Sequence, residues 1–230
     1  KDLRVLAEVM DATVTRTVIK PSRTWISPNL GEVWQYRELL LFLVWRDIKV
    51  RYKQTALGVA WIVLQPLASI AVFSYLFGTL LQVPSDHVPY PVFTYAALLP
   101  WNYFASSLRR STVGVVESRH LITKVYFPRL VIPLAGVLSG LIDFAIAFFV
   151  LIGLMTVFGI MPTPAVLLLP GFTLLASLTA LGFGLWLSAL NVRYRDVQHL
   201  VPYLIQIWMY VTPVVYGTTL IPSRFRFLFA

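Results

Sequence analysis

The sequence predicts an all-α integral membrane protein, on three observations. Of the 230 residues, 58% are hydrophobic and only 13% are charged, whereas a soluble domain carries roughly 25% charged residues. The mean hydropathy is +0.75. Several apolar stretches also reach the roughly 20 residues that a helix needs to cross a bilayer. The chain therefore has too little charge to cover a surface that faces water.

The net charge of +9 is better explained by membrane topology than by a nucleic-acid partner. Of the 19 lysines and arginines, ten precede Leu57, five lie in residues 109–129, and two are Arg193 and Arg195. These groups fall on one side of the membrane if the helices alternate. Because cytoplasmic loops are enriched in lysine and arginine, we expect a multi-pass protein with a cytosolic N-terminus.

The N-terminal part of the chain changes character near residue 32. Residues 1–31 are polar, show no signal peptide and are expected to form a cytosolic segment. Residues 32–56 predict an amphipathic interface helix that lies among lipid headgroups, the alternative being a soluble helix beside a buried one. One face carries Arg46, Lys49 and Lys53, which recur at helical spacing. The apolar side chains share another face: Leu41, Trp45, Ile48 and Tyr52.

Residues 57–230 predict a transmembrane domain with five visible helices. Pro66 should kink the first of them, and Pro100, Trp101 and Asn102 interrupt the second. Five spans would leave the C-terminus outside after an amphipathic tail, so we expect a sixth span that is missing from this chain. The five predicted spans are residues 57–81, 92–108, 130–160, 165–190 and 199–216.

The residue types present argue against an enzyme. No P-loop pattern occurs, so the chain does not bind ATP by that route. Cysteine is absent, and the three histidines lie in separate loops or span ends, so no metal site is expected. A membrane-embedded hydrolase or transferase would show paired acids, or an acid and a histidine, near one interface.

Asp143 is the one acidic residue well within a predicted span. A carboxylate is costly in lipid and should face a partner or a cavity. It could make a polar contact in a translocation path, or a hydrogen bond between helices to Arg109, Asn102 or a serine, and we favour the second interpretation. Gly136 and Gly140 on the same helix permit a close helix–helix approach.

Three sequence patterns resemble one protein family. They are RDIKVRYKQTALGVAWIVLQP at residues 46–66, NVRYRDV at residues 191–197 and TPVVY at residues 212–216. Over about residues 32–222 the chain resembles the membrane (permease) subunit of bacterial polysaccharide ABC exporters. The likeness is greatest to the O-antigen exporter subunit, and capsule and teichoic acid exporters are related to it.

The resemblance implies a set of parts and partners. The family has an interface helix, six spans, and a cytosolic coupling helix between the second and third spans. Two copies form a channel at a homodimer interface and pair with two ATPase subunits, which hold ATP and magnesium, so this chain carries no cofactor. The implied substrate is an undecaprenyl-pyrophosphate-linked polysaccharide, and the implied location is the bacterial inner membrane.

By this resemblance the coupling helix lies at residues 117–129. The segment is short and mixes charges with apolar side chains, as docking to a soluble ATPase requires. Leu121 and Val125 are four residues apart and would share a face. The alternative is a plain basic loop. The predicted docking residues are Glu117, Arg119, Leu121, Lys124, Val125, Tyr126 and Phe127.

Aromatic residues in the outer halves of the spans suit a glycan, because sugar rings stack on aromatic faces. Four of them are predicted to line the channel, namely Tyr95, Trp101, Tyr103 and Phe104. The alternative is an interfacial aromatic belt. Alanine at these four positions is expected to impair export while leaving assembly intact.

Basic residues at the cytosolic interface are candidates to bind the pyrophosphate of the lipid carrier. General attraction to anionic lipid explains them equally well. The candidates are Arg46, Lys49, Arg51, Lys53, Arg193 and Arg195.

Other function classes fit less well than an export permease. A secondary transporter would need internal repeats and ionisable residues at mid-membrane, but the sequence shows no repeat and only Asp143. A membrane-embedded glycolipid transferase would need a cluster of acids or histidines at one interface, and none is apparent. Export of capsule or teichoic acid by the same architecture remains the main alternative.

Overall fold

The computed structural model describes residues 30–53, 60–81, 88–212 and 214, and all regular structure in these ranges is helical. Within them, three helical stretches are long and apolar enough to cross a membrane: Val63–Leu80, Val131–Val157 and Pro164–Arg193. They coincide with the first, third and fourth predicted spans. The all-α membrane class is confirmed, whereas the count of five spans, and the expectation of a sixth that is missing from this chain, stay predictions.

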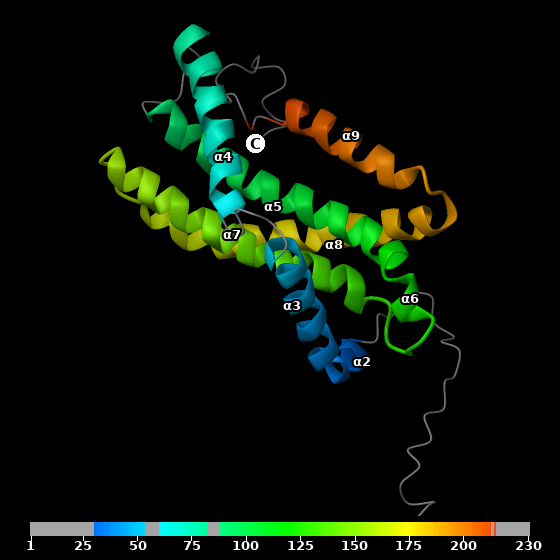
Figure 1. Ribbon diagram of the computed structural model, residues 1–230. Coiled ribbons are helices and arrows are strands. Elements are labelled where there is room, and N and C mark those ends of the chain that lie inside the picture. The colour runs from blue at the N-terminus through cyan, green and yellow to red at the C-terminus, as the bar shows by residue number, and fades with distance from the viewer. Residues whose placement is uncertain (1–29, 54–59, 82–87, 213, 215–230) are drawn as a thin grey trace, which may run out of the picture.

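The predicted interface helix is two helices, α2 (Leu30–Gln35) and α3 (Arg37–Lys53). The buried contact of α3 is made by Leu43, which packs against Val131 and Ile132 at the start of α7 (Val131–Val157). Leu41 and Trp45, on the predicted apolar face, stay exposed. In Figure 1, α3 crosses α7 at a steep angle and ends beside the middle of the bundle.

The first span consists of α4 (Ala60–Phe73) followed by a π-helical stretch, η1 (Ser74–Leu80). Pro66 lies inside α4. The helix rests on the rest of the bundle mainly through Ile70, which is buried in a cluster with residues of α5 and α7. Much of its remaining surface is exposed, as expected of a helix that faces lipid.

The centre of the bundle is α5 (Tyr90–Glu117), a 28-residue helix that contacts α4, α7, α8 and α9 (Figure 1). The predicted interruption at Pro100 is wrong, because the helix continues through it. Neighbouring helices hold the turn together although proline removes one backbone hydrogen bond. Thr94, Ser107 and Ser111 are fully buried. A helix surrounded by other helices can therefore be less apolar than one that faces lipid.

Small residues let α7 and α8 (Leu169–Arg193) approach α5 closely. The backbone of Gly136 lies against Arg110, and that of Gly184 lies so close to Ser111 that a side chain has no room. These are the two most extensive helix pairs of the described structure. Gly159, with φ of 68°, reverses the chain after α7, and a short 3₁₀ helix, η2 (Pro164–Leu168), precedes α8.

Two predicted boundaries are corrected by the structure. The coupling helix expected at residues 117–129 is reduced to one turn, α6 (Arg119–Ile122), because Glu117 ends α5 and Phe127 folds back into the core beneath α3. The segment between the fourth and fifth predicted spans is helical as far as Arg193, and the fifth predicted span appears as the shorter helix α9 (Val197–Val211).

Candidate functional site

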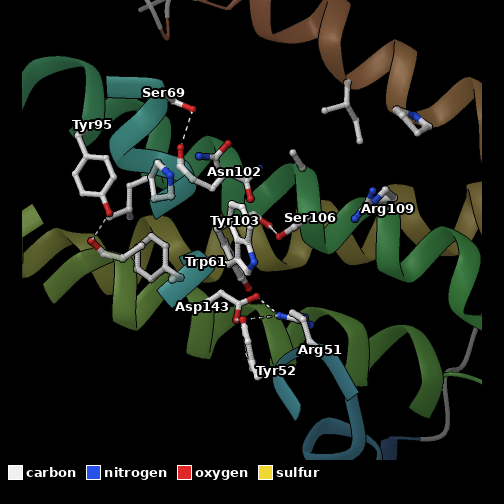
Figure 2. Close-up of a pocket in the computed structure, with 18 residues that line it drawn as sticks. Arg51, Tyr52, Trp61, Ser69, Tyr95, Asn102, Tyr103, Ser106, Arg109 and Asp143 are labelled. Atoms are coloured by element: carbon white, nitrogen blue, oxygen red, sulfur yellow. Dashed lines mark hydrogen bonds and ion pairs between the residues drawn. The ribbon is translucent and has the colours of Figure 1, made fainter. Parts of the chain in front are cut away.

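A cavity of about 650 Å³ lies between α3, α4, α5, α7 and α9. Figure 2 shows its wall, on which aromatic rings alternate with hydroxyl, amide and charged groups. The polar lining residues are Arg51, Tyr52, Gln65, Ser69, Asn102, Ser106, Arg109 and Asp143, and the aromatic ones besides Tyr52 are Trp61, Tyr95, Tyr103 and Phe144. In the described part of the chain no group of three or more His, Cys, Asp or Glu side chains could hold a metal ion.

Asp143 anchors a cluster of charged side chains at one side of this cavity. One carboxylate oxygen accepts hydrogen bonds from Arg51 Nη1 and, at 3.3 Å, from Arg110 Nη1. The other oxygen accepts a hydrogen bond of 2.5 Å from the hydroxyl of Tyr52 (Figure 2). The carboxylate of α7 is therefore bound to α3 and α5 at once.

The favoured interpretation of Asp143, a hydrogen bond between helices, is confirmed, but the suggested partners are wrong. Arg109 and Asn102 line the cavity and do not bond to Asp143. One residue farther along α5 turns the side chain by about 100°, given 3.6 residues per turn, and brings Arg110 against α7. That rotation of α5 could not be read from the sequence.

Arg110 is more enclosed than its neighbours. Its side chain is 19% exposed, against 27% for Arg51 and 25% for Asp143. Its Nη2 donates to Ser106 Oγ at 2.9 Å. Its Nε is buried and has no hydrogen-bond partner within the described residues. The cluster thus holds two guanidinium groups and one carboxylate, and several N–H donors of the two arginines are unused within the described residues.

Two of the four predicted channel aromatics reach the cavity wall. Tyr95 and Tyr103 line it, but both are almost fully buried and hydrogen-bonded to other helices. The Tyr95 hydroxyl donates to the carbonyl of Ala147 at 3.0 Å, and the Tyr103 hydroxyl lies 2.6 Å from Ser177 Oγ. These tyrosines hold α5 to α7 and α8 while presenting part of their surface to the cavity.

Trp101 and Phe104 point elsewhere. Both contact the ring of Trp208 on α9, with centroids 6.5 and 5.5 Å away, and Phe183 of α8 approaches the same ring at 5.9 Å. Neither Trp101 nor Phe104 lines the described cavity. Their position shows an aromatic cluster that holds α9 against α5 and α8, which the sequence interpretation missed.

The sequence interpretation also missed the contribution of α4. Trp61, Gln65 and Ser69 line the cavity and are spaced by four residues, so they form one face of the helix. Two polar side chains at this spacing in an otherwise apolar span could have revealed that this face does not meet lipid. Trp61, rather than the predicted Trp101, places a tryptophan ring in the cavity wall.

The six predicted headgroup-binding cations do not form one site. Arg51 alone lines the cavity. Arg46 pairs with the adjacent Asp47 at 2.8 Å, and Arg193 stacks over Tyr194 with its guanidinium carbon 5.4 Å from the ring centroid. The other three are exposed: Lys49, Lys53 and Arg195.

The predicted coupling residues form a mostly exposed surface beside α2. Phe127 is buried and Leu121 is half-buried against the core of α3, so neither is a free docking side chain. The Tyr126 hydroxyl donates to Glu32 Oε1 at 3.2 Å, and the nearby carboxylate raises the pKa of this phenol. The exposed members are Glu117, Arg119, Lys124, Val125 and Tyr126.

Comparison with known proteins gives one consistent result. The sequence profile of the ABC-2 type transporter family matches residues 38–230. The chain is 35% identical to the O-antigen export system permease protein RfbA of Myxococcus xanthus over 194 aligned residues. The aligned region covers 84% of this chain and 74% of the relative. It is 32% identical over 203 residues to the RfbA protein of Klebsiella pneumoniae, covering 87% and 76%. A shorter region of 78 residues is 33% identical to the polysialic acid transport protein KpsM of Escherichia coli. This region covers 34% of the chain and 29% of that relative.

Proposed function

This chain belongs to the ABC-2 type transporter family, and we propose that it is the transmembrane subunit of an ATP-driven exporter of lipid-linked polysaccharide. The observation that carries the proposal is the similarity to O-antigen export permeases along more than four fifths of the chain. The partial similarity to a polysialic acid transport protein points to the same class of substrate. A secondary transporter or a glycolipid transferase is not favoured by these relatives.

The lining of the cavity supports a carbohydrate substrate. Sugar rings present apolar faces that stack on aromatic side chains, and their hydroxyl groups need hydrogen-bond partners. Trp61 supplies an exposed ring, while Gln65 and Asn102 supply amide groups on the facing helices α4 and α5. We infer that this cavity is part of the path of the glycan, and that a second copy of the chain completes the channel.

The exposed segment around α6 supports docking of a separate ATPase subunit on the cytosolic side. It lies at the end of the bundle where α5 ends and α7 begins, next to α2. In this proposal two ATPase subunits supply ATP and magnesium, the N-terminus is cytosolic, and the complex resides in the bacterial inner membrane. Basic residues outside the cavity, such as Lys49 and Lys53, then contact lipid headgroups.

The proposed path can be tested by removing the amide groups of the cavity. The double variant Gln65→Leu, Asn102→Leu should lower polysaccharide export several-fold, because two hydrogen-bonding groups on the path are replaced by apolar ones. Surface polysaccharide is measured in a strain that lacks its own export permease and carries this chain with its ATPase. Gln206→Leu is the matched control, since Gln206 is exposed on α9 and does not line the described cavity.

Equal export by the double variant and the control would contradict the assignment of the path. Alanine at Tyr95 or Tyr103 is a poor test, because it also breaks the hydrogen bonds that join α5 to α7 and α8. Phenylalanine removes the hydroxyl groups that make the same hydrogen bonds, so neither substitution separates a channel role from a structural role at these two positions.

Docking at α6 has a separate test. Val125→Asp places a charge on an exposed apolar residue of the segment and should reduce co-purification of the ATPase subunit several-fold. Met161→Asp is the control, because Met161 is still more exposed and follows the opposite end of α7. If both variants retain the ATPase equally, this segment is not the docking surface.

A further inference from the structure

We propose that the cluster of Arg51, Arg110 and Asp143 binds the diphosphate group of the lipid carrier, and that Asp143 is the resident counter-ion that the phosphates replace. The inference rests on the proposed function and specifies which part of the substrate is recognised here. The unused donors of the cluster, the charge around the cavity and the depth of Asp143 support it.

Both arginines of the cluster carry N–H donors that are not used within the described residues. A guanidinium group offers five N–H donors in a planar fork that matches phosphate oxygens. Arg51 uses only Nη1 for hydrogen bonds within the described residues, to Asp143 and to Tyr52. Arg110 uses Nη1 and Nη2, and its Nε is buried without a partner in the part of the chain that the structure describes. Asp143 therefore satisfies only part of what the two arginines can donate.

The charges around the cavity favour an anion. Arg51 and Arg110 bond to Asp143, and Arg109 lines the same cavity without bonding to it, so three guanidinium groups accompany a single carboxylate. Two positive charges remain unbalanced at this site. A diphosphate esterified at both ends carries one ionised oxygen on each phosphate, which matches this excess. A neutral glycan would leave it uncompensated.

The depth of the cluster explains why its arginines need a counter-ion supplied by the protein itself. Asp143 lies 12 residues after Val131, which places it about 18 Å along a helix of about 40 Å at 1.5 Å per residue. That position lies within a hydrocarbon layer of about 30 Å. Unpaired arginines are costly there, so an internal carboxylate stabilises them until an anion arrives.

A purely structural role is the competing interpretation, in which the cluster only ties α3 to α7. Arg51 and Asp143 nevertheless keep about a quarter of their side-chain surface accessible and line the cavity. The two interpretations differ in what happens when Arg51 and Asp143 are changed together. If the cluster only joins α3 to α7, the contact is lost when either Arg51 or Asp143 is replaced. If Arg51 binds the ligand, Arg51 is needed for binding whichever residue stands at position 143.

The experiment measures equilibrium binding of a polyprenyl diphosphate without glycan to the complete complex in neutral lipid nanodiscs, without nucleotide. Arg51→Gln should weaken binding roughly tenfold to a hundredfold, as expected for the loss of charge-assisted hydrogen bonds. Arg46→Gln is the matched control on the same helix, since Arg46 pairs with Asp47 and does not line the described cavity. Its affinity should be unchanged, and an equal loss in both variants would overturn the proposal.

Asp143→Asn keeps the shape and removes the competing charge, so it should bind the diphosphate at least as tightly as the parent chain. Weaker binding would overturn the role of counter-ion. The double variant Arg51→Gln, Asp143→Asn should remain as weak as Arg51→Gln alone, and its recovery to parental affinity would show that Arg51 serves only to hold Asp143. Size-exclusion profiles and unfolding temperatures confirm that each variant is folded.

Three further ligands identify the chemistry that is recognised. Polyprenyl monophosphate should bind more weakly than the diphosphate, and a polyprenyl alcohol should show no dependence on Arg51. Nanodiscs rich in phosphatidylglycerol test whether any anionic headgroup suffices, and loss of diphosphate binding in them would overturn specific recognition. Failure of the parent complex to export polysaccharide would refute the proposed function, whereas this binding assay would still report on the cluster.

Discussion

Gly184→Ala should destabilise the protein by about 1–3 kcal/mol, the usual cost of an overpacked helix contact. A Cβ atom at position 184 would collide with Cβ of Ser111 on α5. Because α5 and α8 form the most extensive helix pair of the described structure, separating them disturbs the centre of the bundle. The measurement is the thermal unfolding temperature in a mild detergent.

Gly182→Ala is the control, since nothing lies within 4 Å of the Cβ atom that it adds. Alanine favours a helix over glycine by up to about 1 kcal/mol, so this variant should be neutral or slightly more stable. Ser111→Gly combined with Gly184→Ala removes one of the colliding atoms and should restore part of the loss. Equal unfolding temperatures for Gly184→Ala and Gly182→Ala would contradict the close contact between α5 and α8.

Trp208→Ala should cost about 2–4 kcal/mol and loosen α9. The indole ring contacts Trp101, Phe104 and Phe183, and each aromatic pair contributes about 0.5–1.5 kcal/mol beyond the area that it buries. Because α9 has few other contacts with the bundle, the amides of α9 should exchange hydrogen faster while those of α5 remain protected. Hydrogen exchange followed by mass spectrometry measures both helices in one experiment.

Trp186→Ala provides the comparison. Trp186 lies on α8 with 62% of its surface exposed and makes no ring contact in the described part of the chain. Its replacement should leave the exchange of α9 unchanged. If the two tryptophan variants behave alike, the aromatic cluster does not hold α9.

Properties that depend on composition were predicted well from the sequence. The apolar runs gave the membrane class and three of the spans, and the motifs pointed to the family. Properties that depend on how a helix is rotated about its own axis were not predicted. Arg109 and Arg110 are adjacent in α5, yet one faces the cavity and the other faces Asp143. Likewise, Trp61 on α4 and Trp101 on α5 are both tryptophans in predicted spans. Trp61 lines the cavity and Trp101 does not, because the side of its helix on which each one lies is different.

Local signals also failed where tertiary packing outweighs them. Pro100 predicted a break, but α5 is held on several sides and continues. The segment before α7 has the mixed composition of a docking helix, but burial of Phe127 beneath α3 leaves only one helical turn. Neither the enclosure of α5 nor the burial of Phe127 can be inferred from neighbouring residues in the sequence.

The shared core of α3 and the segment after α6 has a mechanical consequence. Leu43 of α3 belongs to one buried cluster with Val33 of α2, with Phe127 of the segment after α6 and with Val131 at the start of α7. A force applied near Phe127 would therefore tilt α3 about the buried contact of Leu43. Arg51 lies eight residues beyond Leu43, the buried contact of α3, which is about 12 Å along the helix. If an ATPase subunit docks beside α6 as proposed, a tilt of α3 by a few degrees would shift the guanidinium group of Arg51 by about 1 Å at the cavity wall, and ATP hydrolysis and ligand affinity would be coupled through this one helix.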